Sequence, residues 1–266
     1  HEGSEVDTIT VTQDIESSVE KIKAFIEEYN KLIDNINGKV KEKYDRNYLP
    51  LTEEQKADMK EDDIKRWEEK AKTGLLRNDS LLQNITLAMR RALYEKVEGV
   101  NISLADIGIS SKSYTDYGKL YLDEDKLRNA LSTRPEEVAK LFNGVSEQVP
   151  SYDRDLSKEE RDIRYNNSGV LVRISDILED YISTKRNKDG KKGFLLEKAG
   201  IENDLSNTQN FINEQLKDYD KRINNMVEKL IKKEEQYYRQ FSRLETLLTQ
   251  MNQQSAWIMN QFMGNW

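Results

Sequence analysis

The chain has 266 residues, of which 34% are charged and 36% apolar, with a net charge of −7 and no cysteine. The lack of cysteine excludes disulfides, thiol nucleophiles and iron–sulfur clusters. The one histidine, His1, is the first residue of the sequence, so no other histidine is present for a catalytic triad. The negative charge disfavours nucleic acid as a partner, and no apolar run reaches the ~18 residues of a membrane span. An apolar fraction below the usual ~45–50% leaves two classes, disordered chains or long helices with a narrow apolar stripe.

The first 40 residues contain a strand pattern followed by a helix pattern. Residues 8–12 alternate β-branched side chains and predict a short strand. From Ile15 onward, apolar residues recur at alternating steps of four and three, and Asp14 is placed to cap the resulting helix. We expect this heptad stripe to pack against other helices. Its positions are Ile15, Val19, Ile22, Ile26, Tyr29, Ile33, Ile36 and Val40.

Two further helices are predicted before residue 95. Pro50 interrupts the chain, and Thr52 with Gln55 three residues later matches a capping box that begins a charged helix ending near Gly74. Asp79 and Ser80 begin the next helix, which carries apolar residues on one face. These helices would add to a mainly helical fold.

The pattern changes between 100 and 122, where loosely alternating apolar residues and glycines predict two short strands in a hairpin. Asp123 then caps a short helix, and Pro135 lies in the first turn of another that ends at Asn143. The polar stretch 145–166 lacks a period and predicts a loop.

A helix is predicted over about 169–184, followed by a basic loop at 185–193 with five cationic residues. A phosphate or nucleic-acid site there is an alternative. We interpret the segment as a solvated loop because no aromatic residues alternate with the charges.

The segment 201–262 contains no proline or glycine and predicts a helix of about 93 Å, which no globule of this size could enclose. We therefore expect an elongated antiparallel bundle, in which 15–44 and about 201–235 form a shaft with 49–143 alongside. The last residues would expose an apolar stripe that requires a partner chain. The predicted packing positions are Ile212, Leu216, Tyr219, Ile223, Met226 and Leu230, and the predicted interface positions are Tyr237, Phe241, Leu244, Leu248, Met251, Trp257, Ile258 and Phe262.

Acidic pairs such as Asp62 with Asp63 could in principle serve as the acid and base of a hydrolase. These pairs lie on strongly charged helical stretches, without an apolar pocket that could raise a carboxyl pKa. We interpret them as solvated faces or helix caps, and we predict no catalytic residues, no cofactor and no metal.

Four blocks, in order along the chain, resemble the bacterial flagellar filament cap family, also called hook-associated protein two. They are Ile22-Lys23-Ala24-Phe25 with Tyr29-Asn30-Lys31-Leu32-Ile33; Leu49-Pro50-Leu51-Thr52 with Trp67-Glu68-Glu69-Lys70-Ala71-Lys72-Thr73-Gly74-Leu75-Leu76; Leu104-Ala105-Asp106-Ile107-Gly108-Ile109 with Gly118-Lys119-Leu120 and Asp123; and Gln240-Phe241-Ser242-Arg243-Leu244-Glu245 with Met251-Asn252-Gln253-Gln254-Ser255.

The resemblance implies a non-enzymatic protein that forms a ring at the distal tip of the flagellum, promotes flagellin polymerisation and prevents flagellin leakage. It implies flagellin, hook-associated junction proteins and a cytosolic export chaperone at the C-terminal segment as partners, with export by the flagellar type III system. On this interpretation, 1–13 ends a missing β-rich head domain, 14–235 is the helical shaft, and 236–266 is the assembly segment.

Three other interpretations stay open. Flagellin or a hook–filament junction subunit would share terminal coiled coils, although the Trp67 block argues against both. A generic coiled-coil scaffold would not explain the β element near 100–122. A wall hydrolase using paired carboxylates is the enzymatic alternative.

Overall fold

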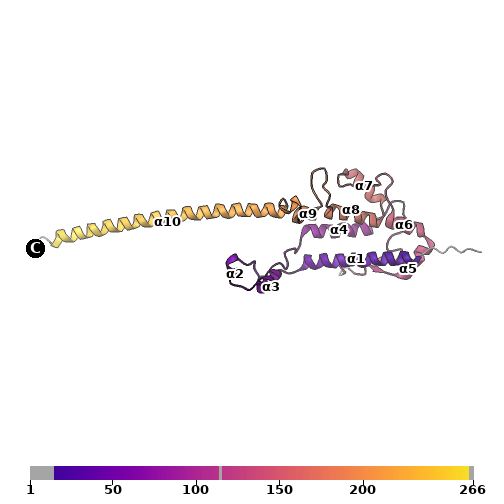
Figure 1. The fold of residues 1–266 in the computed structure, drawn as a ribbon, viewed down its shortest axis with the longest axis horizontal. Helices are drawn as coiled ribbons and strands as arrows, with labels where there is room; N and C mark the ends of the chain where they lie inside the picture. The colour runs from indigo at the N-terminus through magenta and orange to yellow at the C-terminus, as the bar shows by residue number, and fades with distance from the viewer. Residues whose placement is uncertain (1–14, 114–115, 264–266) are drawn as a thin grey trace, which may run out of the picture. The chain divides into compact units, whose positions relative to one another are not determined.

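The apolar stripe that begins at Ile15 forms a long helix. The structure is a computed structural model that describes residues 15–113 and 116–263, and in it α1 runs from Ile15 to Lys41 (Figure 1). Six of the eight stripe positions are buried, and Ile15 and Ile22 pack partly buried against the same core. The predicted cap Asp14 and the predicted strand at 8–12 lie outside the described residues.

The single charged helix predicted from Thr52 to near Gly74 is instead two short helices, α2 (Glu53–Ala57) and α3 (Glu61–Ala71), separated at residues 58–60. The predicted capping box is confirmed, because the Gln55 backbone N–H donates to the Thr52 hydroxyl at 3.3 Å and the Gln55 side chain accepts from Thr52 N at 3.0 Å. Trp67 anchors α3 by donating from Nε1 to the carbonyl of Leu49 at 2.7 Å.

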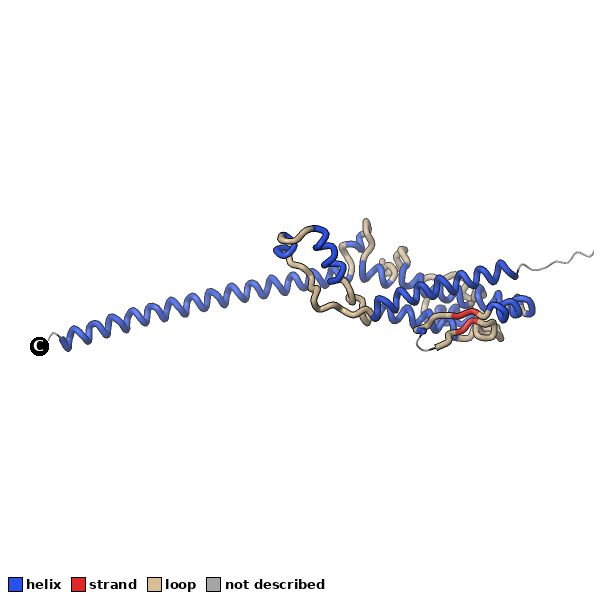
Figure 2. The backbone as a smooth tube through the Cα atoms, turned by 90° about the horizontal axis from the view of Figure 1, so that it is seen from below, coloured by secondary structure: helices blue, strands red, loops and turns tan. Residues whose placement is uncertain are grey.

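The next elements also follow their predicted signals. Helix α4 (Ser80–Tyr94) is capped by Asp79. The predicted hairpin is confirmed as a minimal antiparallel pair, β1 (Ile109–Ser110) with β2 (Tyr121–Leu122), drawn as the only strands in Figure 2. Asp123 caps α5 (Glu124–Thr133), and α6 (Pro135–Asn143) begins at its proline.

The predicted loop at 145–166 is wrong in its second half, where α7 (Lys158–Asn167) forms from a Ser157–Glu160 capping box. Ion pairs, rather than an apolar stripe, hold this helix to α8 (Val170–Ile182). Helix α8 matches the helix predicted at 169–184. Arg161 Nη1 lies 3.0 Å from a carboxylate oxygen of Asp180. The spacing of apolar residues reveals helices with an apolar face, and it therefore misses a helix that is held by ion pairs.

These elements build one core in the first of two compact units, which ends at Leu196. Helix α4 contacts both α1 and α8, so the three form a stack that Figure 1 shows in side view, with α5 and α6 across one end. Within this unit, α4, α5 and β2 pack against α1. The shaft that we expected α1 to form with 201–235 stays a prediction.

The second unit begins at Glu197, within α9 (Phe194–Ala199), and contains a short 3-10 turn followed by α10 (Phe211–Met263). The long helix was predicted to begin near 201 and begins ten residues later. Asn210 accepts from the Asn213 backbone N–H at 2.9 Å and so caps α10, while Gly200 with φ +79° and the Asp204 cap fix the turn before it. The polar caps within 201–210 are the signal that the sequence analysis missed.

Candidate assembly surface

Helix α10 presents its apolar stripe to solvent along its whole described length. It has 53 residues, a length of about 80 Å at 1.5 Å per residue. The six predicted packing positions between Ile212 and Leu230 are 45–70% exposed in the single chain. The predicted interface positions from Tyr237 to Ile258 are 48–68% exposed. The side chain of Phe262 lies outside the described part of the chain.

The stripe stays on one face of an ordinary α-helix, except for Trp257, which lies on the opposite side. Ile212, Leu230 and Leu248 are each 18 residues apart, which is five turns of 3.6 residues. The extra step of four from Leu230 to Glu234 preserves this alignment, whereas an unbroken heptad repeat would drift around the helix. Further exposed apolar side chains widen the face, which favours contact with more than one helix. They are Val227, Ile231, Tyr238, Leu247, Met259 and Met263.

The charge pattern along α10 changes at Glu245, the last charged residue of the chain. From 246 to the end there are amide, hydroxyl and apolar side chains only. An exposed apolar face without flanking charges is a surface that associates rather than one that stays solvated. The sequence analysis identified the stripe but not this loss of charge, which a simple count along the chain would have found.

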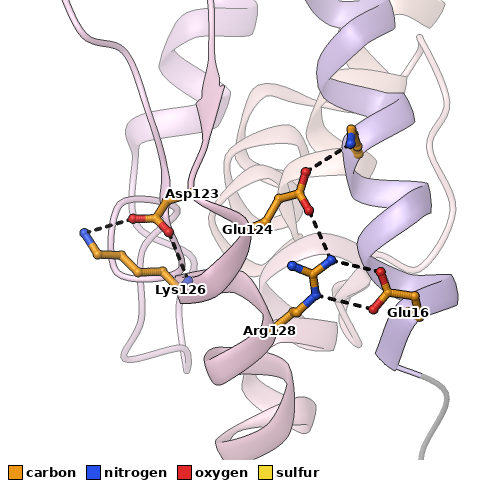
Figure 3. A network of polar contacts seen from close by, with 6 residues as sticks. Glu16, Asp123, Glu124, Lys126 and Arg128 are labelled. Carbon is orange, nitrogen blue, oxygen red and sulfur yellow. Dashed lines mark hydrogen bonds and ion pairs between the residues drawn. The ribbon is translucent and has the colours of Figure 1, made fainter.

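In the first unit, the polar groups fix the helices to one another. Arg128 spans Glu16 of α1 and Glu124 of α5, at 2.9 and 3.1 Å from Nη2, and Lys23 lies 3.0 Å from Glu124 (Figure 3). The hydrogen bond and positive charge of Lys23 lower the pKa of the Glu124 carboxyl. These exposed ion pairs link α5 to α1.

One buried cation has no counterpart in the sequence prediction. Arg173 of α8 is 1% exposed, and its guanidinium donates to the backbone carbonyls of Tyr165, Glu95, Lys96 and Asn166 at 2.6–3.2 Å. It thereby satisfies carbonyls at the ends of α4 and α7. Within the apolar run of α8, nothing in the sequence distinguishes this arginine from an exposed one.

Residues 15–113 and 116–263 contain no group of three or more His, Cys, Asp or Glu side chains that could hold a metal ion. An open groove beside α1 is lined by apolar side chains such as Phe25 and Phe142, with Lys21 its one charged lining residue. Each helix of the described part is too short or too polar to cross a bilayer.

Comparison of the chain with known proteins identifies its relatives. The chain is 36% identical over 258 residues to flagellar hook-associated protein 2 of Halalkalibacterium halodurans, covering 94% of this chain and 46% of that protein. The protein of the same name from Thermotoga maritima is 27% identical over 98% of this chain and 36% of its own length. The chain therefore spans less than half the length of these curated relatives.

A solved structure, that of the flagellar cap protein FliD D1-D2-D3 domains from Escherichia coli, is 23% identical over 63% of this chain and 33% of that chain, with a TM-score of 0.39. Residues 1–253 match the family described as Flagellar hook-associated protein 2 C-terminus. Because that match covers nearly the whole sequence, the chain belongs to the flagellar hook-associated protein 2 family, and it corresponds to the C-terminal region of its members.

Proposed function

We propose that this chain is the C-terminal part of a cap subunit at the distal tip of the bacterial flagellar filament. There it oligomerises as a ring, promotes the polymerisation of exported flagellin and prevents flagellin from leaking away. Membership of the hook-associated protein 2 family supports a flagellar role. The observation that carries the proposal is the exposed apolar stripe of α10.

The stripe supplies the driving force for assembly. Burying a large apolar side chain contributes about 1.5–3 kcal/mol, and α10 carries more than a dozen such side chains that are about half exposed. We infer that positions 212–230 pack within the shaft of the assembled cap and that 236–266 contacts other cap subunits, flagellin or hook-associated junction proteins. The work of such a cap is binding, without covalent chemistry.

The same surface would be a liability before export, since an exposed apolar helix associates with other chains. We propose that a cytosolic chaperone covers 236–266 until the flagellar type III system exports the subunit. Its final location is then outside the cell, at the tip of the filament.

The test is filament growth in a cap-deficient strain supplied with the full-length protein. Deleting 236–266 should leave a folded helical first unit but abolish both capping and chaperone binding. A finer variant, Leu244→Ala/Leu248→Ala/Met251→Ala, keeps helix propensity and removes the centre of the stripe. Its matched control, Arg239→Ala/Thr246→Ala/Gln253→Ala, alters the opposite face of α10 over the same turns.

We expect the stripe variant to lose filament growth and the control to retain it. Restored growth with the deleted protein would overturn the assignment of 236–266. Electron microscopy separates the cap from other axial proteins, because a cap forms small closed rings whereas flagellin forms long filaments.

A further inference from the structure

The segment around α2 presents an acidic surface. Residues 53–63 contain six carboxylates and two lysines, a net charge of 2 − 6 = −4. Three of the carboxylates, on Glu54, Asp58 and Asp62, are exposed and take part in none of the ion pairs of the described chain. Beside them Leu49 is 60% exposed. We call residues 49–63 the acidic projection.

The acidic projection is held to α3. Lys56 bridges α2 and α3 through ion pairs with Glu53 and Glu68 at 3.3 and 3.1 Å. The ring of Trp67 lies edge-on to Tyr48, with centroids 4.8 Å apart. Docking on this surface therefore requires little ordering of the backbone, and the entropy cost of association is reduced.

The loop between α8 and α9 has the opposite charge. Residues 185–192 contain five cationic side chains and one aspartate, a net charge of 5 − 1 = +4. Lys185, Lys188 and Lys191 are exposed. Ile182 and Phe194 flank the loop and are 51% and 50% exposed. This set, the basic loop, thus combines positive charge with exposed apolar groups, as the acidic projection combines negative charge with an exposed leucine.

The backbone of the basic loop is held by hydrogen bonds from side chains. The guanidinium of Arg154 donates to the carbonyls of Lys185 and Lys191, both at 3.1 Å, and of Lys192 at 2.6 Å. Asn187 Oδ1 accepts from the backbone of Lys191 at 2.8 Å. The backbone groups are satisfied internally, so the loop is fixed while its exposed ammonium groups are available for another molecule.

The two surfaces follow the two outer helices of the α1–α4–α8 stack, α1 and α8. Figure 1 shows α2 and α3 below the end of α1, while the loop that joins α8 to α9 rises on the other side of α4. Complementary surfaces on different sides of one unit can meet only between separate copies. Such a contact is head-to-tail, and it closes into a ring when the rotation between copies permits.

We propose that the acidic projection of one chain docks on the basic loop of a second copy, a contact that rests on the proposed ring function and supplies its lateral interface. Lys185, Lys188 and Lys191 of one copy meet Glu54, Asp58 and Asp62 of the next, and Leu49 packs near Ile182 and Phe194. Opposite charges orient the copies and specify which faces meet.

A charge exchange in the full-length protein tests this contact. One variant is Glu54→Lys/Asp58→Lys/Asp62→Lys, a second is Lys185→Glu/Lys188→Glu/Lys191→Glu, and a third combines all six substitutions. The control, Glu20→Lys/Glu27→Lys/Glu136→Lys, makes the first variant's charge change at exposed positions elsewhere. Sedimentation velocity measures the dissociation constant of the oligomer, and circular dichroism verifies the helix content.

Each three-residue variant should raise the dissociation constant at least about tenfold, because like charges then face each other. The six-residue variant should restore wild-type assembly, and the control should not change it. If the three-residue variants assemble like a wild type that still caps filaments, the contact is wrong and the proposed function stands. Failure of the six-residue variant to recover also overturns the contact. A wild-type protein that neither oligomerises nor caps overturns both.

Discussion

Helices α1 and α10 carry the same apolar spacing with opposite outcomes. Ile33 of α1 is fully buried, whereas Ile223, at an equivalent stripe position in α10, is 56% exposed. The difference comes from the neighbours, because α4, α5 and β2 cover α1. A 3-4 spacing thus predicts that a helix has an apolar face but not which chain covers that face.

The composition of the two stripes also differs. Seven of the eight positions of the α1 stripe are Ile or Val, with Tyr29 the exception. The α10 stripe contains tyrosine, phenylalanine, methionine and leucine as well as isoleucine. Stiff β-branched side chains suit one fixed core, while aromatic residues and methionine are enriched at interfaces between proteins. Composition therefore gives information that spacing alone does not.

The largest expected effect is on the buried cation of the first unit. Arg173→Leu should lower the free energy of unfolding by about 3–5 kcal/mol, since it removes a buried charged donor from four backbone carbonyls. Of these four, the Asn166 carbonyl keeps a second donor, the Glu98 N–H at 2.9 Å. Arg239→Leu in α10 should change it by less than about 0.5 kcal/mol. Urea denaturation followed by circular dichroism measures both, and equal losses would contradict the contrast between the two units.

The second prediction compares the stripes directly. Ile33→Ala should cost about 2–5 kcal/mol because it opens a cavity in the core, whereas Ile223→Ala should stay within about 0.5 kcal/mol in the isolated chain. In the assembled oligomer the difference between the two losses should become smaller, since the proposed assembly buries Ile223. A large loss for Ile223→Ala in the monomer would show that the single chain already covers α10.

The sequence predicts most of the helices of the first unit, because caps such as Thr52, Asp79 and Asp123 and the α1 stripe are local signals. Helix α7 was not predicted, because its stability depends on Arg161 and on ion pairs with a helix that follows it in the chain. Those pairs arise only after tertiary folding. The choice of α4 and α5 as partners of α1 is likewise a tertiary property.

The exposed apolar face of α10 was predictable for the same reason that α1 was, while its role in assembly stays a prediction. Its spacing is local, and its exposure follows from the length of an uninterrupted helix. What the sequence alone could not supply is the second set of surfaces, the acidic projection and the basic loop. From the sequence, the basic loop was interpreted as solvated, whereas the hydrogen bonds that Arg154 and Asn187 make with its backbone show that it is fixed.

The third prediction concerns glycines at which two backbone segments approach closely. Such contacts occur in the first unit, whereas α10 contains no glycine. A Cβ at Gly169 would lie 2.7 Å from the carbonyl of Phe142, so Gly169→Ala should destabilise by about 1–3 kcal/mol. A Cβ at Gly38, in the last turn of α1, meets nothing within 4 Å, so Gly38→Ala should stabilise by up to about 0.5–1 kcal/mol. Thermal denaturation measures both, and shifts of the same sign would contradict the packing seen between α6 and α8.

The smallest effect concerns the ion pairs that hold α5 against α1. Lys23 lowers the pKa of the Glu124 carboxyl below its ordinary value near 4.5, so this pair stabilises the fold above that pH. The stabilisation is lost as the pH falls through the lower pKa of the folded state. Glu124→Gln should therefore lower the melting temperature slightly at pH 7, and the difference from wild type should vanish in acid and shrink in high salt.

A double-mutant cycle shows whether Lys23 causes this dependence. Lys23→Met should produce the same small loss at pH 7, and adding Glu124→Gln to it should cost less than Glu124→Gln alone, with Arg128 accounting for the remainder. Independent losses would show that Lys23 and Glu124 do not interact in solution. The position of α5 on α1 would then depend on the Arg128–Glu16 pair and on apolar packing through side chains such as Leu127, which is fully buried.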